Sequence, residues 1–250
     1  MALKEEFEQQ GIWLFRYRSY LPLIILLVGL GVFIYMKTHP YLFFLENTRW
    51  ESAYELLCLS VGIFGLLIRV YTVGHTPANT SGRNVTNQVA DMLNTTGIYS
   101  TVRHPLYLGN YLMWLAPALL TGQVWFIVAF TLAYWLYYER IMFAEEQFLS
   151  RKFGESYAQW ACSRPAFVPK FTCFKKPSLP FSWKKVIKKE KNGLLALLLI
   201  FLLFDYTGNA IQGSNKIDIP LLTACIAMGI IYVILKYLKM YTRVLDEENR

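Results

Sequence analysis

Long apolar stretches separated by shorter polar ones dominate the pattern along the chain. A helix needs roughly 20 mostly apolar residues to cross a membrane core about 30 Å thick, and flanking Tyr, Trp and Lys side chains can extend a shorter run. By that measure the pattern predicts six membrane-spanning helices. The predicted spans are residues 21–36, 53–73, 106–120, 124–138, 194–206 and 221–237. The fifth run is the shortest, and it is also compatible with a re-entrant segment.

Composition favours a membrane protein over a soluble domain. Apolar residues make up 55% of the chain and charged residues only 17%, whereas soluble domains have about 45–50% and about 25%. A chain of 250 residues cannot bury this excess in its own core, so part of it must face lipid. The predicted fold class is therefore all-α: a polytopic transmembrane helical bundle of about six spans.

The distribution of positive charge predicts how the bundle is oriented. The net charge is +8, and residues 140–191 hold twelve of the 25 lysines and arginines. Because such residues are enriched in cytoplasmic loops, this segment should be cytoplasmic, and alternation along the chain then places both termini there as well. Charge on one membrane face favours anionic lipid headgroups over nucleic acid as its partner. The lysine-rich run 184–191 is predicted to be a juxtamembrane anchor.

The cysteines and histidines lack the spacing of a metal site. The four cysteines show no CxxC pattern, and the three histidines are widely separated. We therefore expect no metal ligands and no disulfide framework.

A polar segment precedes the predicted third span. Residues 97–110 contain Arg103, His104 and Pro105 in succession. Proline is well tolerated in the first turn of a helix, where its missing N–H has no intrahelical partner to lose. Arg103 and His104 should therefore lie at the mouth of the span, where free backbone N–H groups can bind an anion.

A second polar segment follows the predicted fourth span. Residues 139–160 carry Glu145 and Glu146, and their apolar residues recur every three or four positions. This spacing predicts an amphipathic helix at the cytoplasmic membrane face, interrupted at Gly154. Because the tight turn at residues 121–123 makes the two spans a hairpin, both polar segments should meet at one membrane face and form a pocket.

These segments resemble the isoprenylcysteine carboxyl methyltransferase and phospholipid methyltransferase superfamily. The resemblance covers roughly residues 60–170 and rests on an ordered set of motifs. The motifs are Gly97-x-Tyr99-x3-Arg103-His104-Pro105-x-Tyr107-x-Gly109, then Glu145-Glu146-x2-Leu149-x3-Phe153-Gly154-x2-Tyr157, then Pro165-x3-Pro169. Residues 76–83 and 95–97 look like those of bacterial members, so the implied location is the bacterial inner membrane.

The resemblance implies an integral-membrane methyltransferase that uses S-adenosylmethionine and methylates a membrane lipid or another hydrophobic acceptor at the cytoplasmic face. Carried over by position, the cofactor-binding residues are His104, Pro105, Tyr107, Gly109, Glu145, Glu146 and Pro165. The implied catalytic residues are Arg103, which would orient the acceptor, and Glu146. An amine acceptor would need His104 or Glu146 as a base, whereas an anionic acceptor would need none.

Three regions and two other function classes complete the sequence-based view. Residues 1–52 hold the first span and loop, residues 53–170 the methyltransferase-like membrane domain, and residues 171–250 the basic segment and two further apolar segments. One open alternative is an NADPH-dependent membrane reductase of a sterol or polyprenoid, which should carry extra cationic residues for the 2′-phosphate. The other is a non-catalytic membrane subunit that retains the pocket.

Overall fold

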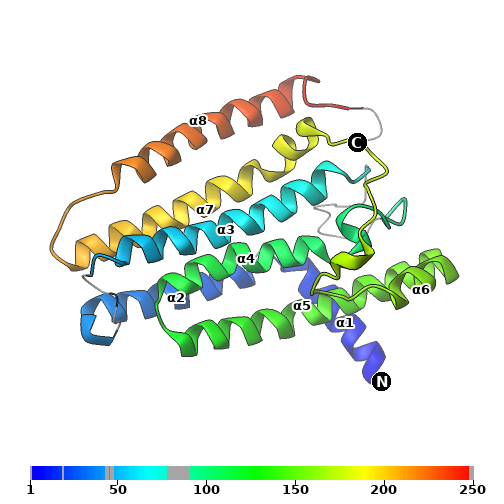
Figure 1. The fold of residues 1–250 in the computed structure, drawn as a ribbon, viewed down its shortest axis with the longest axis horizontal. Helices are drawn as coiled ribbons and strands as arrows, with labels where there is room; N and C mark the ends of the chain where they lie inside the picture. Colours follow the sequence, from blue (N-terminus) through cyan, green and yellow to red (C-terminus); the bar gives the residue numbers. More distant parts are fainter. Residues whose placement is uncertain (1, 19, 43–44, 46–47, 78–89, 248–250) are drawn as a thin grey trace.

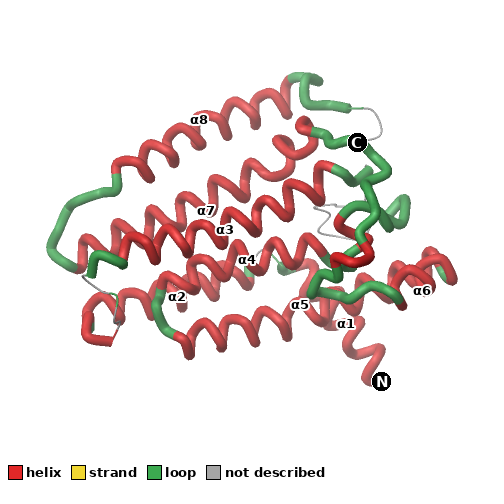
Figure 2. Tube along the Cα trace, viewed as in Figure 1, coloured by secondary structure: helices red, strands yellow, loops and turns green. Residues whose placement is uncertain are grey.

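A computed structural model describes residues 2–18, 20–42, 45, 48–77 and 90–247, and this part of the chain is built from helices (Figures 1 and 2). Its α-helices are α1 (Leu3–Arg16), α2 (Leu21–Thr38), α3 (Glu51–Gly74), α4 (Pro105–Leu120), α5 (Val124–Phe153), α6 (Glu155–Cys162), α7 (Trp183–Ile211) and α8 (Ile219–Tyr241). Its short 3-10 helices are η1 (Pro40–Leu42), η2 (Ile98–Ser100) and η3 (Phe171–Cys173). Within these residues the one strand-like pairing is an isolated bridge between Gly97 and Lys175. The all-α prediction is confirmed.

Each of the six predicted apolar runs lies within one helix. Three helices, α3, α7 and α8, are long and apolar enough to cross a membrane, judged by length and composition over the described residues. The apolar part of α2, Pro22–Thr38, is shorter. The count of six spans remains a prediction. Helix α1, which the apolar pattern did not indicate, packs against α5.

Helix α5 differs from the expected arrangement of a span followed by a separate surface helix. It is one continuous helix of 30 residues, so Glu145 and Glu146 lie on the same helix as the apolar residues of the hairpin. No proline or glycine lies between residues 124 and 153 to end it. The predicted interruption at Gly154 is confirmed, since its φ of 52° places the residue in the left-handed region that glycine tolerates best. Helix α6 begins directly after it.

Glycines bring α3 and α4 into close contact. A Cβ atom on Gly65 would lie 2.6 Å from the backbone oxygen of Gly109, and one on Gly109 would lie 2.6 Å from Cγ of Arg69. Small residues of this kind let helix backbones approach each other closely in membrane bundles. The contact places Arg69 of α3 beside the first turns of α4.

Helix α7 lies between α8 and α3 in the bundle (Figure 1) and also contacts α2 and α4. Its first turns contain the lysine-rich run that was predicted to be a juxtamembrane anchor. Lys184 in this run is exposed, whereas Lys185, Glu190 and Lys191 are buried, and Lys185 Nζ donates to the backbone oxygens of Thr76 and Pro77 at 2.6 and 2.8 Å. Lys185 therefore fastens α7 to the end of α3, and an anchoring role of the exposed lysine stays a prediction.

We predict that Gly65→Ala destabilises the bundle. In an open helical position glycine to alanine is favourable by about 1 kcal/mol, but at Gly65 the added methyl group would meet rigid backbone atoms of α4, and overpacking of this kind costs about 1–3 kcal/mol. Thermal unfolding of the detergent-solubilised protein should show a lower midpoint. Gly31→Ala in α2 is the matched control, because a Cβ atom there meets nothing within 4 Å. Equal midpoints for the two variants would contradict the close contact.

Candidate active site

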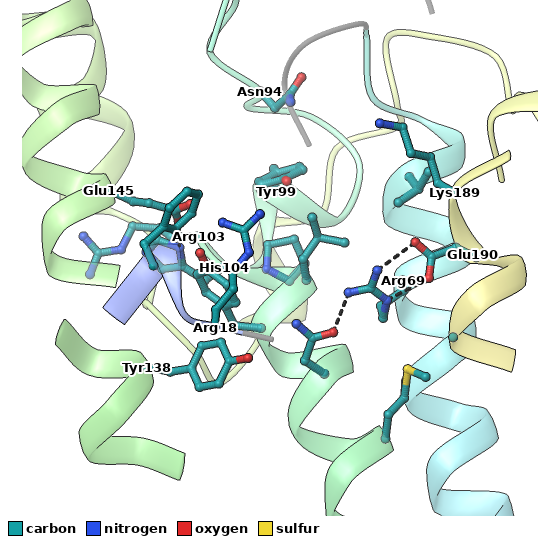
Figure 3. Close-up of a pocket in the computed structure, with 18 of the residues that line it drawn as sticks. Arg18, Arg69, Asn94, Tyr99, Arg103, His104, Tyr138, Glu145, Lys189 and Glu190 are labelled. Atoms are coloured by element: carbon teal, nitrogen blue, oxygen red, sulfur yellow. Dashed lines mark hydrogen bonds and ion pairs between the residues drawn. The ribbon is translucent and has the colours of Figure 1, made fainter. Parts of the chain in front are cut away.

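A cavity of about 770 Å³ lies where α4 begins, enclosed by residues of helices α1 to α7 and of the segments before α2 and α4. Two polar walls face each other across it (Figure 3). One wall is formed by Arg103, His104 and Glu145, and the other by Arg69 and Glu190. The first wall consists of residues indicated by the sequence motifs, whereas the second was not anticipated.

His104 lies between two carboxylates. Its Nε2 is 2.9 Å from Glu146 Oε1, and its Nδ1 is 3.6 Å from Glu145 Oε2. Burial alone would lower the pKa of His104, but the hydrogen bonding and negative charge of the two glutamates outweigh burial and raise it. Both ring nitrogens face acceptors, which favours the doubly protonated imidazolium. The predicted meeting of the Arg-His pair with the acidic pair is confirmed.

Glu146 is the shared partner of both cations at this wall. Arg103 Nη1 donates to its Oε2 at 3.0 Å, while its Oε1 faces His104. Burial would raise the pKa of Glu146, but the hydrogen bond from His104 and the charges of His104 and Arg103 lower it. Glu146 stands behind these two residues, and it is not among the residues that line the cavity.

The segment after α6 holds this wall in place through its backbone. The N–H groups of Arg103 and His104 donate to the oxygens of Pro165 and Ala166 at 2.9 and 3.1 Å, and the N–H of Lys170 donates to Thr101 O at 2.9 Å. Pro165 therefore supports the polar segment from outside. This pairing fixes the approach of the chain to the first turn of α4.

The predicted site residues thus separate into two groups. Those that line the cavity are Arg103, His104, Pro105, Tyr107 and Glu145. Those that stand behind the lining are Gly109, Glu146 and Pro165. Residues 78–83, part of the segment that looks like bacterial members, lie outside the described residues.

The opposite wall joins α3 to α7. Arg69 donates from Nε to Glu190 Oε2 and from Nη2 to Glu190 Oε1, both at 2.8 Å, and from Nη1 to Asn110 Oδ1. An arginine inside an apolar run and a lone glutamate within a lysine-rich run were visible signals. Ionisable residues at such depth are usually paired. The sequence contained no indication that these two would be partners.

Two residues that line the cavity carry a buried N–H donor without a hydrogen-bond partner among the described residues: Arg103 at Nε and Trp160 at Nε1. The hydroxyl of Tyr157 on the same wall interacts with Glu146 and Arg103. Burial, together with the charge of Glu146, raises the pKa of Tyr157, so its hydroxyl remains protonated and able to donate. Unsatisfied buried donors are costly in a native structure. The side chains that carry these donors line the cavity, which suits a ligand with oxygen acceptors.

Comparison with known proteins supports the superfamily resemblance. Residues 56–156 match the family model described as phospholipid methyltransferase. A protein-S-isoprenylcysteine O-methyltransferase of Schizosaccharomyces pombe is 35% identical over 78 residues, which are 31% of this chain and 33% of that protein.

Two further relatives carry names that refer to metal resistance. The nickel-cobalt-cadmium resistance protein NccN of Alcaligenes xylosoxydans xylosoxydans is 31% identical over 135 residues, 53% of this chain and 60% of that protein. The cobalt-zinc-cadmium resistance protein CzcN of Cupriavidus metallidurans is 31% identical over 132 residues, 52% of this chain and 57% of that protein. The chain thus spans between a third and about 60% of the length of these three curated relatives. No solved structure gives a significant match.

We predict that Glu146→Gln lowers the pKa of His104, because the substitution removes one of the two carboxylates that raise it. Histidine NMR across a pH series measures this directly. The same pairing makes the free energy of unfolding depend on pH. Its contribution is lost as pH falls through the lowered pKa of Glu146, and it is also lost as pH rises through the raised pKa of His104. The melting temperature of wild type should exceed that of Glu146→Gln most clearly between these two values.

Glu139→Gln is the control, since Glu139 pairs with Arg140 and does not contact His104. An unchanged His104 titration in Glu146→Gln would contradict the pairing.

Proposed function

We propose, taking as premise that residues 56–156 belong to the isoprenylcysteine carboxyl methyltransferase and phospholipid methyltransferase superfamily, that the protein transfers a methyl group from S-adenosylmethionine to a lipid or other hydrophobic acceptor. One observation carries this proposal. Five residues of the superfamily motifs line one cavity at the end of a helical hairpin, and Glu146 binds two of them from behind. The five are Arg103, His104, Pro105, Tyr107 and Glu145.

The residues present fit S-adenosylmethionine, which when bound supplies an electrophilic methyl group on a sulfonium. The carboxylate of Glu145 suits a cation, and the aromatic residues Tyr107 and Tyr138 line the same cavity. The unpaired N–H groups of Arg103 and Trp160 suit the oxygens of the cofactor's carboxylate or ribose. This donor set accounts for atoms that the described chain leaves unsatisfied.

The protonation of the site favours an acceptor that needs no base. Two carboxylates raise the pKa of His104 and favour its imidazolium form, and two cations lower the pKa of Glu146 and make it a weaker base. Methyl transfer to an anionic oxygen then depends on alignment and exclusion of water, which contribute up to roughly 7–11 kcal/mol in ideal cases. We therefore assign Glu146 to positioning and not to proton transfer.

Arg103 is the residue proposed to orient the acceptor. One edge of its guanidinium is bound by Glu146, while Nε remains a buried donor without a partner among the described residues. An arginine fixed in this way can present a planar pair of donors to a carboxylate or phosphate. The same residue therefore connects the positioning carboxylate to the reaction centre.

The membrane topology belongs to the same proposal. Six spans would place both termini and the cavity at the cytoplasmic face of a bacterial inner membrane. The concentration of lysine and arginine in residues 140–191 supports this orientation, because such residues mark cytoplasmic loops. A cavity at that face would be open to a soluble cofactor and to a lipid at the same time.

S-adenosylhomocysteine is expected to stabilise the protein, and NADPH is not. A ligand at ~100 times its Kd adds roughly 2.7 kcal/mol to the free energy of unfolding, which thermal unfolding in detergent detects. His104→Ala should remove the shift, whereas His39→Ala, in the segment after α2 and away from the cavity, should keep it. Stabilisation by NADPH alone would indicate a membrane reductase. Stabilisation by neither ligand would indicate a non-catalytic membrane subunit.

Arg103→Lys should lower methyl transfer with little change in S-adenosylhomocysteine affinity. Lysine cannot reproduce the bidentate donor geometry, and the loss of one to two charge-assisted hydrogen bonds is about 2–4 kcal/mol, or roughly thirty- to a thousand-fold in rate. Incorporation of labelled methyl groups into extracted membrane lipid measures turnover. Arg164→Lys is the matched control, because Arg164 lies close by without lining the cavity. Normal turnover in Arg103→Lys would refute the orienting role.

A further inference from the structure

The wall opposite His104 is built partly by a helix outside the matched methyltransferase segment. Helix α7 follows residues 56–156 in the chain, and its Glu190 faces Arg69 across the α3–α7 contact. Figure 3 shows this pair on the far side of the cavity from Arg103, His104 and Glu145. The side chain of Glu190 is 5% exposed and that of Arg69 18%, so the pair is largely withdrawn from solvent.

The charges of this wall cancel each other. Both oxygens of Glu190 accept from Arg69, and Asn110 accepts a third hydrogen bond from the same guanidinium. An anion at this level would have to displace Glu190 from a bidentate contact, one of the strongest hydrogen-bonding arrangements in proteins. The wall is therefore suited to a polar group without net charge, such as an ester or a hydroxyl.

An apolar space begins one turn further along α7. Gly193 is three residues after Glu190 and lies on the same face of the helix. A Cβ atom on Gly193 would have as its nearest neighbours Met113 Cε at 3.3 Å, Leu66 Cδ1 at 3.6 Å and Glu190 Oε2 at 3.7 Å, all side-chain atoms. The cavity continues between α4 and α7 along Met113, Ala196, Leu197 and Ile200. The polar pair and the apolar space thus adjoin within one wall.

We propose that α7 is the acceptor-selecting wall of the cavity: the part lined by Met113, Gly193 and Ile200 receives an apolar chain. The Arg69–Glu190 pair receives the uncharged polar group, such as an ester, that joins this chain to the anionic group held by Arg103. This inference rests on the proposed function and assigns specificity to residues that the superfamily motifs do not include. The cavity volume, about 770 Å³, lies in the upper part of the ~300–1,000 Å³ range of small-molecule sites, which leaves room for part of an acceptor beside a cofactor.

Photolabelling tests the chain site without requiring turnover. The full protein in phosphatidylcholine vesicles is labelled with an 18-carbon fatty alcohol that carries a mid-chain diazirine, and labelled residues are mapped by mass spectrometry. We expect Met113, Ala196 or Ile200 to be labelled well above lipid-facing residues of α8 such as Val233. Gly193→Leu should lower the cavity labelling several-fold. Gly229→Leu in α8 is the matched control, since a Cβ atom there meets nothing within 4 Å, and it should leave the labelling unchanged.

A second arm tests the head position. The corresponding fatty acid is compared with the alcohol in wild type and in Glu190→Gln, which uncovers the charge of Arg69. The ratio of acid to alcohol labelling in the cavity should rise several-fold in the variant. S-adenosylhomocysteine binding, measured in parallel, reports on the proposed function separately. The chain site would be overturned if labelling in the cavity were no stronger than labelling of α8, or if Gly193→Leu and Gly229→Leu showed equal cavity labelling. The head position would be overturned if the ratio of acid to alcohol labelling were unchanged in Glu190→Gln.

Discussion

The contact of Glu146 with both Arg103 and His104 is the interaction on which the site depends. It joins the far end of α5 to the residues that lead into α4, and so closes the polar end of a hairpin whose turn lies at residues 121–123. Arg103 and Glu146 are each 22% exposed and His104 only 6%, so removing Glu146 would leave partly desolvated cations without this partner. The carboxylate therefore keeps two cations in a partly desolvated position that neither would adopt alone.

A second pairing of a glutamate with an arginine lies across the cavity. Glu190 of α7 neutralises Arg69 of α3, as Glu146 neutralises the cations before α4. In both places a glutamate on a helix pairs with an arginine from another part of the chain. Arg103 lies in the segment before α4, which is held by backbone hydrogen bonds to Pro165 and Ala166, whereas Arg69 lies on α3 and is brought within reach by helix packing. For Arg69 that packing depends on Gly109, because a side chain there would collide with the arginine itself. Gly109 thus contributes to this wall by leaving room for the Arg69 side chain and not by contacting a ligand.

The sequence predicts the local elements and one of the two walls. Apolar runs identified the six helices that hold them, and the short turn between two of these made the meeting of Arg103 and His104 with Glu145 and Glu146 a geometric consequence. Arg69 and Glu190 lie 121 residues apart, and nothing in either local pattern encodes which helices become neighbours. Helix α1 was missed because it is too polar for a span. The lysine-rich run was interpreted by composition, which cannot distinguish a lipid-facing lysine from Lys185 buried against backbone oxygens.

Charge balance links this architecture to the chemistry proposed for it. The cations Arg103 and His104 are paired with carboxylates on one wall, and Arg69 is paired with Glu190 on the other, which removes the large penalty of an uncompensated buried charge at these positions. Within such a site the pairing favours the charged form of each group: it raises the pKa of His104 and lowers the pKa of Glu146. A reaction that required either group to exchange a proton would first have to break the pairing that holds the site together. Methyl transfer from a sulfonium to an already anionic oxygen makes no such demand, and the arrangement of charges favours that reaction over transfer to a protonated amine.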